Sequence, residues 1–148
     1  MRLVGLHALE SLRLEKSYRA MFRDMNPELT AWESGLQRFI RLDKGDFIGR
    51  DALVGKQDSS RRSVTLAIDT DGVSSLASEG VYQKGKLVGR VTSGGYAYTL
   101  GHDIALALLP AELAVIGTEL EIPILGDMRN ARVVPEAPYD PASARARM

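Results

Sequence analysis

Short apolar stretches separated by glycine turns fill the second half of the sequence. Of all the features of the sequence, this pattern constrains the possible folds most strongly. Strands are predicted at 63–69, 80–83, 86–93, 103–109, 119–125 and 128–134. Lys84-Gly85 and Gly126-Asp127 predict hairpin turns, because glycine takes up the positive φ that tight turns require. Short strands at such spacing are typical of a small antiparallel barrel or sandwich, and the residues alone leave both open.

The earlier part of the sequence has a mixed pattern. A helix, a strand and a short helix are predicted at 2–16, 36–42 and 47–54, the last with Asp46 as its N-cap. Thr30 and Glu33 have the spacing of a capping box, in which each side chain binds the other residue's amide. A polar stretch after Gly55 indicates a linker. We therefore place a domain boundary there, between residues 1–55 and residues 56–148.

Arg13 lies in the first predicted helix, at the edge of an apolar stripe. The stripe consists of Leu6, Leu9 and Leu12. A buried guanidinium stays charged, so an anionic partner must offset its desolvation. Glu10 and Glu15 offer internal salt bridges, and a solvated position on the helix rim is a further alternative. The functional interpretation is a fixed cation that binds an acidic ligand.

Composition argues against several classes of protein. The 148 residues carry 19 Lys and Arg against 19 Asp and Glu, so no overall charge attracts nucleic acid or an anionic membrane. No apolar run approaches the roughly 20 residues that span a bilayer, and the N-terminus lacks a signal-peptide layout. The absence of cysteine excludes disulfides and Cys-ligated metals. We expect a soluble, cytoplasmic chain with no nucleic-acid partner and no membrane partner.

Few motifs carry recognisable chemistry. The sequence has no dinucleotide-binding glycine motif, no phosphate loop and no His-Glu-x-x-His zinc motif, and we predict no metal site. His7 and His102 lack the neighbours of a catalytic base. Thr92-Ser93-Gly94-Gly95 resembles an anion cradle, but such a segment between strands more often forms a bend or bulge.

Two pairs of side chains at the predicted barrel are also candidate binding-site residues. Arg61-Arg62 would place a second cation beside Arg13, unless the pair is a solvated linker end. Tyr96 and Tyr98 follow the glycines in a predicted loop. We expect one tyrosine to pack inward and the other to cap a surface cleft.

Several segments together carry a family pattern. They lie at 11–16, 24–26, 33–36, 44–53, 89–101, 104–107, 117–120 and 138–141, and include Ser-Leu-Arg-Leu-Glu-Lys and Lys-Gly-Asp-Phe-Ile-Gly-Arg-Asp-Ala-Leu. Taken in order, they closely resemble the C-terminal part of the aminomethyltransferase family. This family comprises the glycine cleavage T-protein and the folate-binding halves of dimethylglycine and sarcosine dehydrogenases. The segment Leu-Glu-Lys-Ser-Tyr-Arg is more similar to the dehydrogenase branch than to the T-protein itself.

The resemblance implies an α+β, mainly β fold. Residues 1–55 would be the end of the family's middle folate-binding domain, with short helices and a strand, and residues 56–148 a six-stranded antiparallel β-barrel. The implied activity is transfer of a one-carbon unit from a small amine to tetrahydrofolate, which forms 5,10-methylenetetrahydrofolate. FAD would bind only in a separate domain of a longer dehydrogenase parent.

The resemblance also limits what the chain does alone. The family's catalytic acid lies in an N-terminal domain outside this sequence, so we assign no catalytic residue and leave the enzyme status open. We expect the chain to be inactive alone, with the missing N-terminal domain or another copy of itself as partner. The alternative is a non-catalytic interaction or structural module that keeps the fold without binding folate.

Site residues carry over one by one. The arginine of the family's Leu-Arg-Leu-Glu motif lines the folate pocket, and the resemblance implies this role for Arg13. A guanidinium suits the role because it can bind a carboxylate, such as that of folate's glutamyl tail, through two parallel hydrogen bonds. Glu15, Arg62 and Tyr96 are the other candidate cofactor-binding residues. The chain departs from the pattern at two points. Dehydrogenase relatives tend to have Trp-Gly where it reads Met21-Phe22, and Thr-Pro where it reads Thr30-Ala31.

Overall fold

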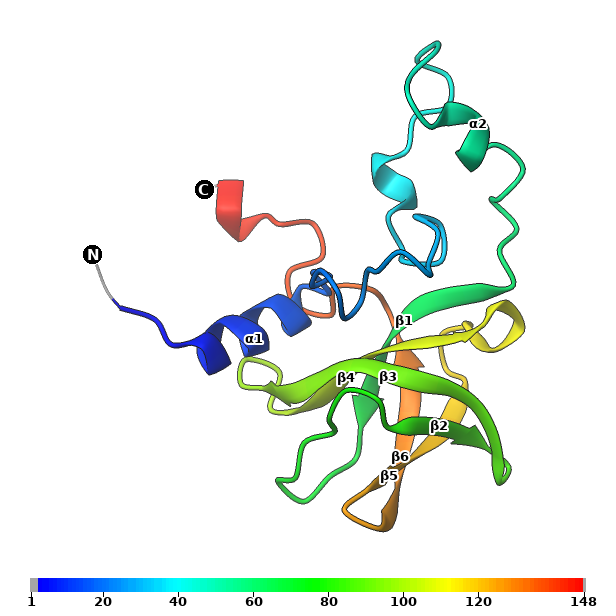
Figure 1. The fold of residues 1–148 in the computed structure, drawn as a ribbon. Coiled ribbons are helices and arrows are strands. Elements are labelled where there is room, and N and C mark those ends of the chain that lie inside the picture. The colour runs from blue at the N-terminus through cyan, green and yellow to red at the C-terminus, as the bar shows by residue number, and fades with distance from the viewer. Residues whose placement is uncertain (1–2, 148) are drawn as a thin grey trace.

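Six antiparallel strands close into a barrel in the computed structural model, which describes residues 3–147 (Figure 1). The strands are β1 Arg61–Ile68, β2 Gly80–Gln83, β3 Lys86–Ala97, β4 His102–Pro110, β5 Glu119–Ile124 and β6 Asp127–Val134. Their order around the barrel is β1-β4-β3-β2-β5-β6. The predicted class, mainly β with a six-stranded antiparallel barrel, is confirmed, and the sandwich is excluded.

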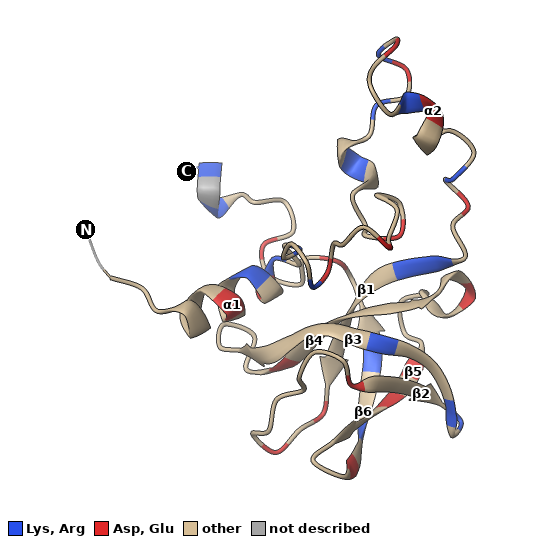
Figure 2. Cartoon of the chain, viewed as in Figure 1, with Lys and Arg blue, Asp and Glu red and all other residues tan. Residues whose placement is uncertain are grey.

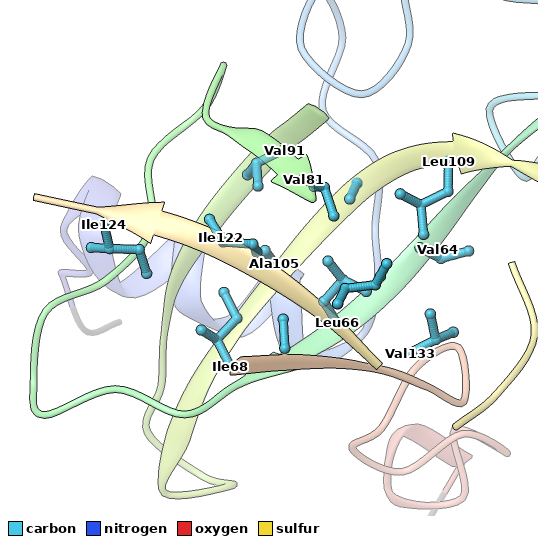
Figure 3. Close-up of a cluster of buried hydrophobic side chains, with 13 residues drawn as sticks. Val64, Leu66, Ile68, Val81, Val91, Ala105, Leu109, Ile122, Ile124 and Val133 are labelled. Atoms are coloured by element: carbon cyan, nitrogen blue, oxygen red, sulfur yellow. The ribbon is translucent and has the colours of Figure 1, made fainter. Parts of the chain in front are cut away.

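The barrel interior is filled by one apolar cluster to which all six strands contribute. Figure 3 shows these side chains pointing inward, among them Val64, Leu66 and Ile68 of β1. These three alternate with outward-facing neighbours, as their spacing predicts. Every residue from 104 to 109 in β4 is buried, however, because a second cluster covers the outer face of this strand. That cluster joins Leu14 of the first helix to Ala97, Ile104 and Leu106.

Strand β3 is longer than predicted. It continues through Gly94, Gly95 and Tyr96, which we expected in a loop, because β4 is long enough to pair with them. A Cβ on Gly94 would lie 2.4 Å from the Ser75 carbonyl oxygen, so the missing side chain lets the β1–β2 connection approach. The predicted bulge is confirmed: the β3–β4 register shifts between Val91 and Ser93.

The first helix buries a different face from the predicted one. Helix α1 spans Leu6–Glu15, shorter than the predicted 2–16. The leucine stripe is exposed: Leu6, Leu9 and Leu12 retain 79%, 54% and 54% of their accessible surface. Its opposite face, with Ser11, Leu14 and Glu15, is buried against β3 and β4. The stripe prediction was wrong because Leu14 and two hydrogen-bonded polar side chains make the barrel contact.

The rest of the N-terminal segment contains little regular structure and projects away from the barrel toward α2 (Figure 1). The prediction of a strand at 36–42 is wrong. The 3-10 helix η1 Gln37–Phe39 lies there, and none of the six barrel strands includes these residues. The predicted helix at 47–54 is reduced to α2 Arg50–Leu53, which follows Gly49 at φ 87° without a side-chain cap from Asp46. The remaining 3-10 helices are η2 Ala111–Leu113 and η3 Arg145–Arg147.

The capping box is present, although it closes a turn. The Thr30 amide donates to Glu33 Oε2 (2.9 Å), and the Glu33 amide donates to Thr30 Oγ1 (3.2 Å). Charged residues of both signs are interspersed along the ribbon (Figure 2). Within residues 3–147, no helix combines the length and apolar character needed to cross a bilayer. The domain boundary near Gly55 remains a prediction.

Candidate functional site

Arg13 is engaged entirely by groups of its own chain. Nε and Nη2 donate to Glu10 Oε2 (2.9 and 2.6 Å), and Nη2 also donates to Ser93 Oγ (2.8 Å). Nη1 donates to Asp24 Oδ2 (3.0 Å) and to the Tyr18 carbonyl oxygen (3.1 Å). These bonds use all five N–H groups of the guanidinium. The internal alternative with Glu10 is confirmed, and a folate contact of Arg13 stays a prediction.

Asp24 is the second anion on Arg13, and sequence reasoning missed it. Its side chain is fully buried. Oδ2 also accepts from the Ala20 amide (2.8 Å), and Oδ1 accepts from Thr92 Oγ1 (2.5 Å) and Ser93 Oγ (2.8 Å). The segment that resembled an anion cradle therefore holds a carboxylate of the same chain. The sequence holds no local signal for this contact, because Asp24 lies 68 and 69 residues from the two hydroxyls.

Glu10 completes this polar cluster on its solvent side. Its Oε1 accepts from Arg23 Nη2 (2.5 Å), so Arg23, not Arg61 or Arg62, is the cation that shares an acid with Arg13. The hydrogen bond from Arg13 is the main cause that lowers the pKa of Glu10 below its ordinary value. Arg23 lowers it further, and together they outweigh partial burial.

The other three predicted site residues lie at two places. Glu15 is buried; its Oε1 accepts from the Thr99 amide (2.6 Å), while Oε2 has no partner among the described residues. Tyr96 is half-buried beside α1, and its carbonyl oxygen accepts from Ser11 Oγ (2.8 Å). Arg62 is exposed and borders a small pocket of about 180 Å³ with Arg19 and Glu136, which Arg13 does not line.

The aromatic pair differs from the prediction. Tyr96 and Tyr98 contact each other edge to face, with ring centroids 5.0 Å apart. Tyr96 is half-buried and Tyr98, in the turn after β3, is exposed, so neither ring is buried in the interior. Arg61, the residue before Arg62, does not contact Arg13 either. Its Nε donates to Glu33 Oε1 (2.9 Å).

A pocket of about 480 Å³ lies where the turn after α1 meets the segment around η1. We call it the Tyr18 pocket, after one of its lining residues. Its lining includes Tyr18, Arg19, Met25, Gly35, Arg38 and Phe39. Aromatic and apolar side chains beside two guanidinium groups are suited to an anion that carries a flat ring.

The two arginines of the Tyr18 pocket differ in their setting. The Arg19 side chain is only 5% exposed, and its Nε and Nη1 bind Ser34, Ser17 and Glu136. Its Nη2 has no hydrogen-bond partner within residues 3–147. A Cβ on Gly35 would lie 2.4 Å from that nitrogen, so glycine leaves the space it occupies.

Arg38 has no acidic partner in the described part of the chain. Its Cζ lies 4.7 Å from the centroid of the Phe39 ring. The sequence signal for this residue was weak: Arg38 only interrupted the alternation of the strand predicted at 36–42. The pocket itself joins residues far apart in sequence, such as Arg19 and Ser143, and no local pattern reveals it.

Comparisons with known proteins agree with this architecture, a closed barrel preceded by a helix and an irregular segment. The profile of the glycine cleavage T-protein C-terminal barrel domain matches residues 61–140, and that of the GCVT N-terminal domain matches residues 1–44. The chain thus has the C-terminal barrel of a T-protein-like protein. It belongs to the glycine cleavage T-protein family of aminomethyltransferases and related dehydrogenases.

Individual relatives are much longer than this chain. Mouse mitochondrial dimethylglycine dehydrogenase is 38% identical over 147 residues, which is 97% of this chain and 17% of that protein. The aminomethyltransferase of Moorella thermoacetica is 40% identical over 132 residues, 88% of this chain and 36% of that protein. The crystal structure of aminomethyltransferase T from Bartonella henselae superimposes with a TM-score of 0.85 at 26% identity, covering 93% of this chain and 39% of that one.

Proposed function

We propose that this chain is the folate-side, C-terminal part of a tetrahydrofolate-dependent one-carbon transferase. The parent would be an aminomethyltransferase or a dimethylglycine or sarcosine dehydrogenase-like enzyme that moves a one-carbon unit from an amine to tetrahydrofolate. Family membership supports the general chemistry. The Tyr18 pocket carries the proposal for this chain, because it offers cations and aromatic rings at one place.

The lining of the Tyr18 pocket fits the chemistry of tetrahydrofolate. A folate has a flat ring system, an aromatic linker and a glutamate tail with two carboxylates. The half-exposed ring of Tyr18 would contact the flat part, and Arg38 would pair with a carboxylate or stack on a ring. Arg13 has no free N–H, so the proposal does not require it. Bound tetrahydrofolate would supply the nitrogen that accepts the one-carbon unit.

The partner we propose is an N-terminal domain of a longer parent, because this chain spans only 36% of the Moorella thermoacetica aminomethyltransferase. The leucine face, Leu6, Leu9 and Leu12 of α1, would lie against it. Exposed apolar faces of this kind mark contact surfaces. Any FAD would bind in a further domain of a dehydrogenase-type parent. The same exposed face favours the second candidate, an interaction module that keeps the fold without binding folate.

A titration separates the two functions. The 15N-labelled chain is titrated with 5-formyltetrahydrofolate, an air-stable folate, and followed by NMR. We expect shifts at the amides of Tyr18, Gly35 and Phe39. Arg38→Ala should weaken binding roughly tenfold, or about 1.4 kcal/mol. Arg41→Ala is the matched control, because Arg41 is exposed and does not line the pocket. Absence of binding would favour the interaction module, whereas binding with equal affinity in Arg38→Ala would mean that Arg38 does not contact the ligand.

A further inference from the structure

Asp24 connects three parts of the molecule through one buried carboxylate. Its four donors come from α1 (Arg13), from the turn that follows (Ala20) and from β3 (Thr92 and Ser93). The Asp24 side chain has no exposed surface, so water does not replace these donors. Loss of the carboxylate would leave the Arg13 guanidinium, itself only 10% exposed, without one of its two anions.

The bulge in β3 makes this arrangement possible. Adjacent residues of a regular strand point to opposite faces. Thr92 and Ser93 are adjacent, yet both hydroxyls donate to Asp24 Oδ1. The β3–β4 register shifts between Val91 and Ser93, which turns both side chains toward the same side. The bulge is therefore built into the Asp24 site.

The turn held by Asp24 forms one wall of the Tyr18 pocket. Within this turn the Asp24 and Met25 amides donate to the Ala20 carbonyl oxygen (3.0 and 3.2 Å). The Tyr18 carbonyl oxygen accepts from Arg13, which in turn binds Asp24. Tyr18, Arg19 and Met25 line the pocket from this turn, whereas Asp24 itself does not.

We propose that Asp24 is a positioning residue for ligand binding in the Tyr18 pocket. Its carboxylate fixes the turn at residues 18–25 against the bulge of β3, through Arg13 and the Ala20 amide, and so holds Tyr18 and Arg19 in place. The inference rests on the proposed function for the ligand it serves. The clamp on the turn is measurable without any ligand.

The test compares Asp24→Ala with Glu10→Ala, because each removes one carboxylate from Arg13. Glu10 contacts neither the Ala20 amide nor β3, and its side chain is 34% exposed, so water can replace it. Hydrogen exchange of the Asp24 and Met25 amides is measured without ligand. Affinity for 5-formyltetrahydrofolate is then measured at a temperature well below the unfolding temperatures of both variants. Asp24→Ala should exchange at least tenfold faster at these amides and bind at least tenfold more weakly. Glu10→Ala should change each by less than twofold.

The outcomes are distinguishable. A lower unfolding temperature for Asp24→Ala with unchanged affinity and unchanged exchange at the turn would overturn the inference, because it indicates a purely structural role. If the unsubstituted chain binds no folate, the proposed function fails, and the exchange data alone decide whether Asp24 holds the turn. If Asp24→Ala does not fold, Asp24→Asn, which keeps the side-chain volume, replaces it in both measurements.

Discussion

Thirteen apolar side chains from all six strands bury one another inside the barrel, whereas Leu14 is the one described residue of the first 55 that joins an apolar cluster. The N-terminal segment is instead attached through polar groups: the Arg13–Asp24 cluster at one end and the Glu33–Arg61 ion pair at the other. Neither η1 nor α2 contains a buried residue. A hydrophobic core stabilises the barrel, and a few directional contacts orient the segment on it.

The largest difference between the two regions should appear when a leucine is shortened in each. Leu66 is fully buried in the barrel, so Leu66→Ala should cost about 2–5 kcal/mol of the free energy of unfolding. Leu9→Ala removes a side chain that is 54% exposed and should change it by less than about 0.5 kcal/mol. Urea unfolding monitored by circular dichroism measures both. Similar losses would mean that the leucine face is buried in solution.

The same contrast explains which parts of the fold the sequence predicts. Barrel strands follow a two-residue alternation and end at glycine turns such as Lys84-Gly85, so local pattern is enough to place them. Strand β3 extends four residues beyond its predicted end because the next strand, β4, pairs with Gly94 to Ala97, and this pairing overrides the turn tendency of the two glycines. The exposed leucine stripe was mispredicted because local periodicity identifies an apolar face but not the surface that covers it.

The candidate site was predicted only in part, for the same physical reason. The pattern identified Arg13 and an internal acid, Glu10, which is three residues away in the same helix. Asp24, Thr92 and Ser93 meet Arg13 only after the barrel has formed and the bulge has turned two hydroxyls to one side. Arg19 and Arg38 likewise share a pocket through tertiary structure alone. Contacts between distant residues of this kind leave no periodic signal.

A smaller effect tests the polar attachment at Glu33. Burial alone would raise the pKa of Glu33, but hydrogen bonds from Thr30 and Arg61 outweigh it and lower the pKa below the ordinary 4.5. Because the pKa of Glu33 is lower in the folded state, its ionised carboxylate stabilises the native state above pH 4.5. This stabilisation is lost as the pH falls through the folded-state pKa. Glu33→Gln should therefore cost about 1–2 kcal/mol at pH 7 and nothing in strong acid.

Unfolding curves collected from pH 7 down to strong acid check this prediction. Glu28→Gln is the matched control, because Glu28 is exposed in the same segment and has no ion pair with a described residue. Its curve should follow that of the unsubstituted chain at every pH. A loss for Glu33→Gln that is independent of pH would contradict an ionic attachment and indicate that the side chain acts through packing.

The smallest expected effect has the opposite sign and concerns Phe22, in the turn that follows α1. Phe22 has φ 66° and is 79% exposed, so a large side chain is held in the left-handed region with little burial in return. Phe22→Gly should therefore stabilise the chain by about 1 kcal/mol, because glycine adopts this backbone without strain. Phe22→Ala removes the ring but keeps the Cβ, and should change stability by less than half as much. If Phe22→Ala stabilises the chain equally, the exposed ring and not the backbone is the source of the cost; if Phe22→Gly destabilises it, the ring makes a stabilising contact in solution.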